Sequence, residues 1–138
     1  MKKSGAIKTA IYEALSSTLP GVLASAGLAD FDDYVSGTPY DADRKQCAVY
    51  IAPTTYEETY LEREIIVQMT LPGEFGPEEY QDATEDTVFG LASDSIAGAL
   101  TKRYDLTTWY ANELKDGQSA FLLYSLKYTE ELDVCDLY

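Results

Sequence analysis

Residues 61–71 read LEREIIVQMTL. From Leu61 onward every second residue is apolar except Arg63, and the residues between them are polar except Ile66. A period of two is typical of a β-strand with one buried face and one wet face, because successive side chains of a strand point to opposite sides. The Pro72-Gly73 pair that follows predicts the end of this strand. The stretch therefore predicts a sheet that is covered on one face.

Three other regions add to this picture. Residues 47–52, CAVYIA, form an apolar run that Pro53 ends, which predicts a second strand. Residues 54–59 and residues 28–44 are polar, and we expect turns and loops there, although a strand over residues 28–35 is an alternative. Residues 118–128 are apolar on both faces near their start, which predicts a central or subunit-covered strand and not an exposed edge.

A hairpin is predicted near the end of the chain, because Asp116-Gly117 is a strong signal for a two-residue turn. If these two residues form the loop, Trp109 faces Tyr124. In the same register Tyr110 faces Leu123, and Ala111 faces Leu122.

Two helices are predicted. The first begins near Ser4, ends at Pro20-Gly21, and has an apolar stripe made of Ile7, Ala10, Ile11, Ala14, Leu15 and Leu19. The second spans roughly residues 77–100, with acidic residues in its first turn, where the helix dipole favours them. Its expected buried stripe is Tyr80, Ala83, Thr87, Val88, Leu91, Ala92, Ile96 and Ala99.

The order of these elements predicts the α+β class: an antiparallel or mixed β-sheet with two main α-helices packed on it. No repeat or linker divides the 138 residues, so we expect one domain over residues 1–138. Residues 129–138 alternate imperfectly between apolar and acidic residues. They are either a continuation of the last strand or an interaction arm that docks on a neighbouring subunit.

Composition excludes several kinds of chemistry. The chain has no histidine, so Ser–His–Asp and Cys–His nucleophile arrangements cannot be built from it alone. It has 24 acidic and 10 basic residues, a net charge of −14, which opposes binding to a phosphate backbone. Cys47 and Cys135 are expected to be free thiols, and no zinc ligand set exists. We predict no cofactor and no metal.

The acidic residues could hide a site in two ways. Asp30, Asp32 and Asp33 loosely resemble a calcium-binding loop, but no register of that loop has both its glycine and its closing glutamate, so turn formation is the better interpretation. Adjacent glutamates, such as Glu57/Glu58, point apart in a strand and do not face each other in a helix. No pair is therefore singled out for catalysis, and we predict that the chain is not an enzyme.

The 12 tyrosines favour a role in contacts, since Tyr is enriched at protein interfaces, although ordinary sheet packing also explains them. We take as candidate interface residues Tyr56, Tyr60, Trp109, Tyr110, Tyr124, Leu132, Val134 and Tyr138. No apolar stretch approaches the ~20 residues of a membrane span, and no signal peptide is evident. We therefore expect a soluble protein, cytoplasmic or associated with a particle.

The layout resembles the tail terminators and other tail-completion proteins of bacteriophages. The likeness is carried by KTAIYEAL at residues 8–15, AVYIAP at residues 48–53 and FLLYSLKY at residues 121–128. It also includes the long strand ending at Leu71 and the acidic helix that follows it. The likeness is architectural and covers most of the chain, but no diagnostic motif accompanies it. The acidic ending DVCDLY is not part of the pattern.

This resemblance implies a structural role in the virion after assembly in the host cytoplasm. Subunits would form a homo-oligomeric ring, a hexamer, that caps the tail tube and joins the tail to the neck and head-completion proteins. DNA would pass through the acidic lumen without specific binding. Two alternatives stay open: an acidic binding module that inhibits or regulates a basic partner protein, and a small enzyme that uses carboxylates or tyrosine.

Overall fold

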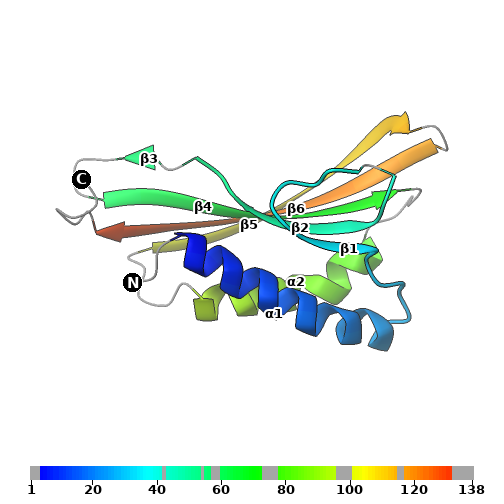
Figure 1. The fold of residues 1–138 in the computed structure, drawn as a ribbon, viewed down its shortest axis with the longest axis horizontal. Helices are drawn as coiled ribbons and strands as arrows, with labels where there is room; N and C mark the ends of the chain where they lie inside the picture. Colours follow the sequence, from blue (N-terminus) through cyan, green and yellow to red (C-terminus); the bar gives the residue numbers. More distant parts are fainter. Residues whose placement is uncertain are drawn as a thin grey trace.

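The computed structural model describes residues 4–41, 43–53, 55–56, 60–72, 78–95, 101–114 and 117–131. The elements are α1 (Ser4–Ser25), β1 (Asp33–Ser36), β2 (Gln46–Ile51), β3 (Thr55–Tyr56), β4 (Tyr60–Pro72), α2 (Glu78–Ser95), β5 (Thr101–Leu114) and β6 (Gly117–Glu131). Both helices lie on the same side of the sheet, so the molecule has two layers (Figure 1). The predicted α+β class is confirmed.

The sheet has six strands in the order β1-β2-β4-β6-β5, and β3 pairs with β4. β1 and β2 are parallel, and all other pairs are antiparallel, so the sheet is mixed. β6 lies between β4 and β5, which confirms that it is a central strand. β5 stands at one end of the order and β1 at the other.

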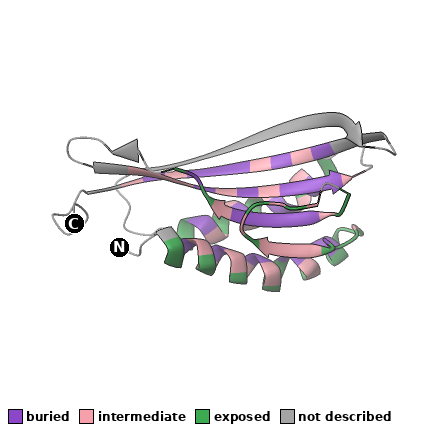
Figure 2. Ribbon diagram, turned by 45° about the horizontal axis from the view of Figure 1, so that its top comes forward, coloured by how far each residue is buried: buried purple, intermediate pink, exposed green. Residues whose placement is uncertain are grey.

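Strand β4 has the predicted alternation, and it organises the core. Its alternate residues Ile65, Val67, Met69 and Leu71 are fully buried, and each pairs with a buried residue of β6. The strands accordingly show buried and half-buried residues in turn along their length (Figure 2). The pairs are Ile65 with Leu126, Val67 with Tyr124, Met69 with Leu122, and Leu71 with Ala120.

Helix α1 presents its apolar stripe to the sheet, but it is longer than predicted. It contains Pro20 and continues to Ser25, so the expected end at Pro20-Gly21 is wrong. A proline inside a helix loses a backbone hydrogen bond. Here the next residue of the stripe, Leu23, is fully buried. Full burial of a leucine contributes about 1.5–3 kcal/mol, which is comparable with the cost of the proline.

The end of α1 is made by Gly27, whose φ is +74°. Leu28 N donates to Leu23 O at 2.9 Å, and Gly27 N donates to Ala24 O at 3.1 Å. These two bonds form a Schellman motif, which satisfies carbonyl groups that have no partner within the helix. Leu28 packs against the core beside this end. Glycine is favoured here because the left-handed backbone conformation is unfavourable for other residues.

Helix α2 buries Tyr80, Thr84, Val88 and Ala92, a stripe at four-residue spacing. Thr84 is the member that the sequence analysis omitted, and Ala83 and Leu91 are partly buried. Thr84 Oγ1 donates to Tyr80 O at 2.7 Å and lies 2.9 Å from the hydroxyl of Tyr124, which therefore acts as the donor. This contact ties α2 to β6. The predicted positions Ile96 and Ala99 lie outside the described residues.

The hairpin between β5 and β6 has a different register from the predicted one. Trp109 pairs with Phe121 and Tyr110 with Ala120, a shift of three residues along β6. The last pair before the turn is Leu114 with Gly117, so the turn lies one residue earlier than expected, and a β-bulge between Ala111 and Leu114 adds the remaining residue of the shift. The local sequence does not indicate a bulge, so the register predicted from the turn residues alone was wrong.

Two polar regions contain short strands, of which the first overlaps the alternative strand over residues 28–35 and the second was not predicted. Asp33–Ser36 pairs with β2, and Thr55–Tyr56 pairs with β4. Tyr34 in β1 contacts the core, and Phe31 beside it is 5% exposed. The apolar residues among the aspartates therefore anchor β1. At the other end of the chain the last strand continues to Glu131, and residues 132–138 lie outside the described residues.

We predict opposite effects for two glycine substitutions in and after α1. Gly27→Ala should lower the free energy of unfolding by about 1–2 kcal/mol, because alanine is unfavourable at positive φ. Gly21→Ala should raise it by roughly 0.5–1 kcal/mol, because Gly21 lies within the helix and a Cβ there meets nothing within 4 Å. Urea denaturation followed by circular dichroism measures both. Equal signs for the two variants would contradict this account of the helix end.

Candidate interaction surface

Among the described residues, no helix covers the face of the sheet that lies opposite α1 and α2 (Figures 1 and 2). The connection between β1 and β2 folds over one end of this face, where Gln46 and Thr70 are buried. Three neighbouring strands contribute alternate residues to it, and we call this set the outer face. Cross-strand pairing arranges its members in three rows. The rows are Gln46, Thr70 and Phe121; Ala48, Gln68 and Leu123; and Tyr50, Ile66 and Ser125.

The outer face combines large apolar side chains with polar side chains that form a hydrogen bond with each other. Tyr50, Ile66, Phe121 and Leu123 are half-buried although no helix covers them. Tyr50 Oη donates to Gln68 Oε1 at 2.7 Å. Burial and, to a smaller extent, the charge of Glu64 raise the pKa of Tyr50, so its hydroxyl stays protonated as the donor. Such a mixture of aromatic, aliphatic and paired polar groups is typical of protein contact surfaces.

Next to these rows, a glutamate is held by a hydrogen bond. Ser125 Oγ donates to Glu64 Oε2. Glu64 also lies opposite Lys127 in the pairing of β4 with β6. The carboxylate is therefore oriented by its neighbours on the sheet, and the charge at this end of the outer face has a defined position.

The connection between β1 and β2 is fastened to the outer face through Gln46, which is 0% exposed. Its Oε1 accepts from Tyr40 N at 3.2 Å and from Asp41 N at 3.3 Å, and its Nε2 donates to Asp33 Oδ2 at 3.0 Å. Parallel strands usually need a dozen or more residues between them, and this connection is shorter. This connection has no crossover helix, and the side chain of Gln46 holds it by hydrogen bonds to its backbone.

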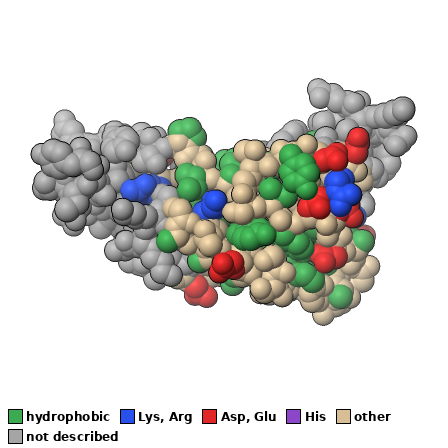
Figure 3. Space-filling view, viewed as in Figure 1, with side chains coloured by type: hydrophobic (Ala, Val, Ile, Leu, Met, Phe, Trp, Pro, Cys, Tyr) green, Lys and Arg blue, Asp and Glu red, His purple; other side chains and the backbone are tan. Residues whose placement is uncertain are grey.

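The aspartates before β2 serve this local structure. Arg44 Nε and Nη2 donate to the two carboxylate oxygens of Asp33 at 2.6 and 3.1 Å. These bonds, followed by that from Gln46, hold the pKa of Asp33 below its usual value. Asp32 accepts from Lys45 N at 3.0 Å, and Asp30 accepts from Tyr34 Oη at 2.6 Å. Acidic side chains gather with a basic one at this end of the molecule (Figure 3).

The interpretation of Asp30, Asp32 and Asp33 as turn-forming residues agrees with these bonds. Within the described part of the chain, no group of three or more Asp, Glu or Cys side chains is placed to hold a metal ion.

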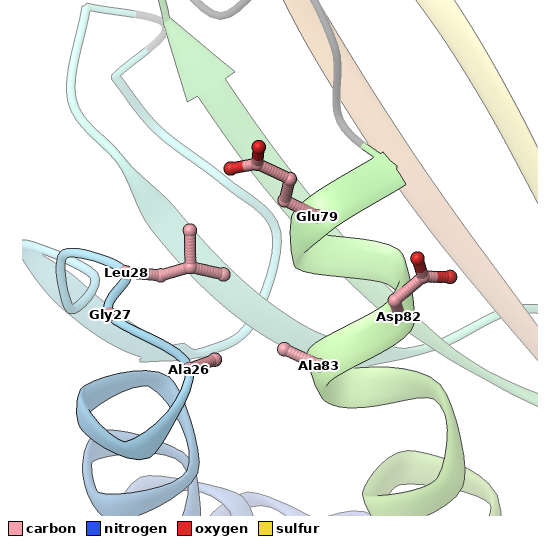
Figure 4. Close-up of a pocket in the computed structure, with 6 residues that line it drawn as sticks. All are labelled: Ala26, Gly27, Leu28, Glu79, Asp82 and Ala83. Atoms are coloured by element: carbon pink, nitrogen blue, oxygen red, sulfur yellow. The ribbon is translucent and has the colours of Figure 1, made fainter.

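A shallow groove of about 490 Å³ lies between the end of α1 and the first turns of α2. It is lined by Ala26, Gly27, Leu28, Glu79, Asp82 and Ala83. Its two carboxylates, Glu79 and Asp82, point in different directions from α2 (Figure 4). They do not converge on a common point, as a cation or a substrate would require.

The reactive side chains that the structure describes are placed for packing. Cys47 is buried, and desolvation raises the pKa of its thiol to about 12, so it is not a thiolate near neutral pH. Desolvation also raises the pKa of Tyr124 to about 12 and that of Tyr34 further. Tyr80 Oη accepts from Lys45 Nζ at 2.8 Å and donates to Ala29 O at 3.0 Å, so its hydroxyl joins α2 to the segment after α1 and to the residue before β2.

The predicted interface residues divide into three groups. Tyr124 is 0% exposed beneath α2, so it is a core residue and not a surface residue. For Tyr56, Tyr60, Trp109 and Tyr110 the structure describes the backbone pairing, which places them on β3, β4 and β5. Leu132, Val134 and Tyr138 lie outside the described residues.

The sequence analysis missed the residues that line the outer face. Ile66 and Leu123 could have been recognised from the sequence, because each is an apolar residue on the side of its strand opposite the core. The role of Gln46 could not, because a glutamine at the start of a strand does not reveal which loop its side chain will bind.

Comparisons with known proteins add little to this description. No protein-family model and no curated protein matches the sequence. A solved structure of the virion of a native gene transfer agent particle contains a similar chain, with a TM-score of 0.38 and 16% sequence identity. The match covers 94% of this chain and 97% of that one. A TM-score at this level is too low to transfer a function. In the parts of the chain that are described, neither helix has the length and apolar character needed to span a membrane.

We predict that Gln46→Leu will destabilise the protein by about 1–3 kcal/mol, because it leaves the amide groups of Tyr40 and Asp41 without their acceptor. Gln68→Leu is the matched control on the same face, since Gln68 is half-buried and accepts one hydrogen bond. It should cost less than about 1 kcal/mol. Chemical denaturation of both variants measures the difference. Equal losses would show that Gln46 does not anchor the connection.

Proposed function

We propose that this chain is a non-enzymatic structural protein of a phage-like particle that works by self-association. In its specific form, the proposal is a tail terminator: a ring of subunits, six in number, that caps the tail tube and joins it to the neck. The virion is then its site of action. Tail-tube and head-completion proteins are its partners, and DNA passes through the ring.

The observation that carries the proposal is the outer face. An open sheet with helices on one side leaves its other side to water or to another molecule. Here that side holds four large apolar side chains, Tyr50, Ile66, Phe121 and Leu123, on adjacent strands. Neighbouring subunits in a ring would bury them, and burial of apolar area is the main favourable term in association.

The electrostatics and the chemistry of the chain support the same function. A net charge of −14 repels DNA, which suits the wall of a channel that DNA must cross without sticking. The thiol of Cys47 and the hydroxyl of Tyr124, both with raised pKa values, lie in the core, and Asp32 and Asp33 bond to their own loop. These groups contribute to folding, whereas Tyr50, Ile66 and Leu123 lie half-buried on the outer face.

We predict that the purified protein forms rings, alone or on tail tubes, and that Leu123→Glu prevents this. A charge on the outer face of a central strand opposes burial by a neighbouring subunit. Thr18→Glu is the control, because Thr18 is exposed on α1, on the other side of the molecule. Negative-stain microscopy and light scattering measure assembly, and circular dichroism confirms folding. A wild-type chain that stays monomeric at high concentration and ignores tail tubes would contradict the proposal.

One observation favours a second candidate, an acidic module that binds a basic partner protein. Helix α2 exposes Glu78, Glu79, Asp82 and Asp86, and residues 78–95 contain no lysine or arginine. This surface could pair with a cationic protein, and such a complex weakens as salt rises.

For this candidate we predict a complex with a basic partner that weakens at least tenfold between 50 and 500 mM NaCl, on the order expected when surface charges are screened. A variant with Glu79→Lys and Asp82→Lys should lose it. Affinity capture from a phage-infected lysate at both salt concentrations, with the Thr18→Glu variant as control, measures this. Salt-independent capture by all three proteins would speak against charge-driven binding.

A further inference from the structure

Strand β5 forms a long edge of the sheet. It has 14 residues, is hydrogen-bonded to β6 on one side, and pairs with no other described strand on its second side. The backbone groups on that second side are a template for another strand. The edge at the other end of the sheet is much shorter, because β1 has four residues. A strand added to the sheet would therefore gain most at β5.

The sequence of β5 does little to block such an addition. Natural edge strands are protected by proline, by charged residues or by short length. Residues 106–112, LTTWYAN, contain no proline and no charged residue. The register with β6 is regular from Thr101 to Ala111, and the bulge comes after it. The regular part of the edge is thus open to pairing over up to 11 residues.

The end of the chain provides a strand of suitable length. β6 ends at Glu131, and seven residues follow, LDVCDLY, over 132–138. We call these residues the arm. The described residues that precede the arm lie beside the beginning of β5, because Thr129 pairs with Thr101. Its apolar residues alternate with acidic ones, although imperfectly, and it has no proline or glycine. This composition is compatible with an added β-strand.

The arm cannot form an antiparallel pair with β5 of its own chain. An antiparallel partner of β5 runs from the end of β5 toward its beginning. The arm follows the end of β6, which lies beside the beginning of β5, so it would first have to extend along the whole of β5. Fourteen residues of strand span roughly 46 Å, whereas seven residues reach at most about 25 Å. A parallel pair with β5 of the same chain would require part of the arm to cross from the β6 side of β5 to its free side. The arm of another copy has neither restriction.

We propose that the arm of one subunit adds as an antiparallel strand to the free edge of β5 in the next subunit. This inference rests on the proposed function, since it names a second contact between subunits, in addition to the outer face. The contact is heterologous, because each subunit gives an arm and receives a different one, and a heterologous contact can close into a ring. Main-chain hydrogen bonds provide the affinity in such strand additions.

The charges of the two partners are complementary. The arm has two acidic residues, Asp133 and Asp136, and no basic residue. The regular part of β5 has two basic residues, Lys102 and Arg103, and one acidic residue, Asp105. In a chain with 10 basic residues among 138, this edge is therefore one of the few segments that can attract an acidic strand. Assembly through the arm should consequently weaken as salt rises.

Disulfide trapping tests the contact in the chain of 138 residues. Cys135 lies in the arm, and Cys47 is buried with a raised pKa, so it does not compete. Single cysteines are placed along β5 as Thr107→Cys, Thr108→Cys and Ala111→Cys. At least one of them should form a disulfide with Cys135 of another subunit on mild oxidation, seen as covalent dimers and larger species on a non-reducing gel. Peptide mass spectrometry identifies the linked pair.

Two controls separate this contact from collision between exposed thiols. Wild type should give no linkage to β5, and Thr18→Cys, on the exposed side of α1, should give no link to Cys135. A chain that ends at Glu131 should lose assembly under conditions in which the wild type is assembled. It keeps every described strand and helix, so circular dichroism should be unchanged.

The outcomes distinguish this inference from the proposed function. Rings of wild type in micrographs, with no linkage at any of the three positions and unimpaired assembly of the shortened chain, would overturn the arm contact and leave the function intact. A disulfide formed within one chain would also overturn it. The proposed function fails in another way, when the wild type forms no ring and does not bind tail tubes.

Discussion

Burial of one face of the sheet beneath two helices is the constraint on which the rest of this structure depends. The stripe of α1 from Ile7 to Leu23 and the alternate residues of β4 and β6 meet in one core. A full set of these residues is buried only if the central strands keep their register, because a shift by one residue would turn the apolar set to the opposite face. The same constraint leaves the outer face without a covering helix among the described residues.

Polar groups support the fold at two places. Gln46 and Asp33 close the short connection between the parallel strands β1 and β2, and Thr84 with Tyr124 joins α2 to β6. Each of these contacts satisfies a buried or half-buried group, so its removal would leave a donor or an acceptor unpaired. The surfaces that remain for function are therefore the outer face, the edge of β5 and the acidic side of α2, all of which suit contacts between proteins.

Part of this contact surface could be predicted from the sequence. The 12 tyrosines indicated interfaces, and apolar residues on both faces near the start of residues 118–128 indicated a central or subunit-covered strand. Residues 129–138 were interpreted as either a continuation of the last strand or an arm. The individual residues could not be predicted, because a tyrosine in a strand packs inward or outward according to register. Tyr124 lies in the core while Tyr50 lies on the outer face, although both are in apolar strands.

The sequence by itself determined the α+β class, the stripe of α1, the alternation of β4 and the central place of β6, because these follow from periodicity along a single element. The tertiary structure alone decided three other features. Pro20 lies inside α1 because Leu23 gains burial beyond it, the hairpin register shifts because a bulge follows Ala111, and Gln46 is buried because a loop folds over it. Each of these depends on what another part of the chain offers across space, and local propensity carries no information about that.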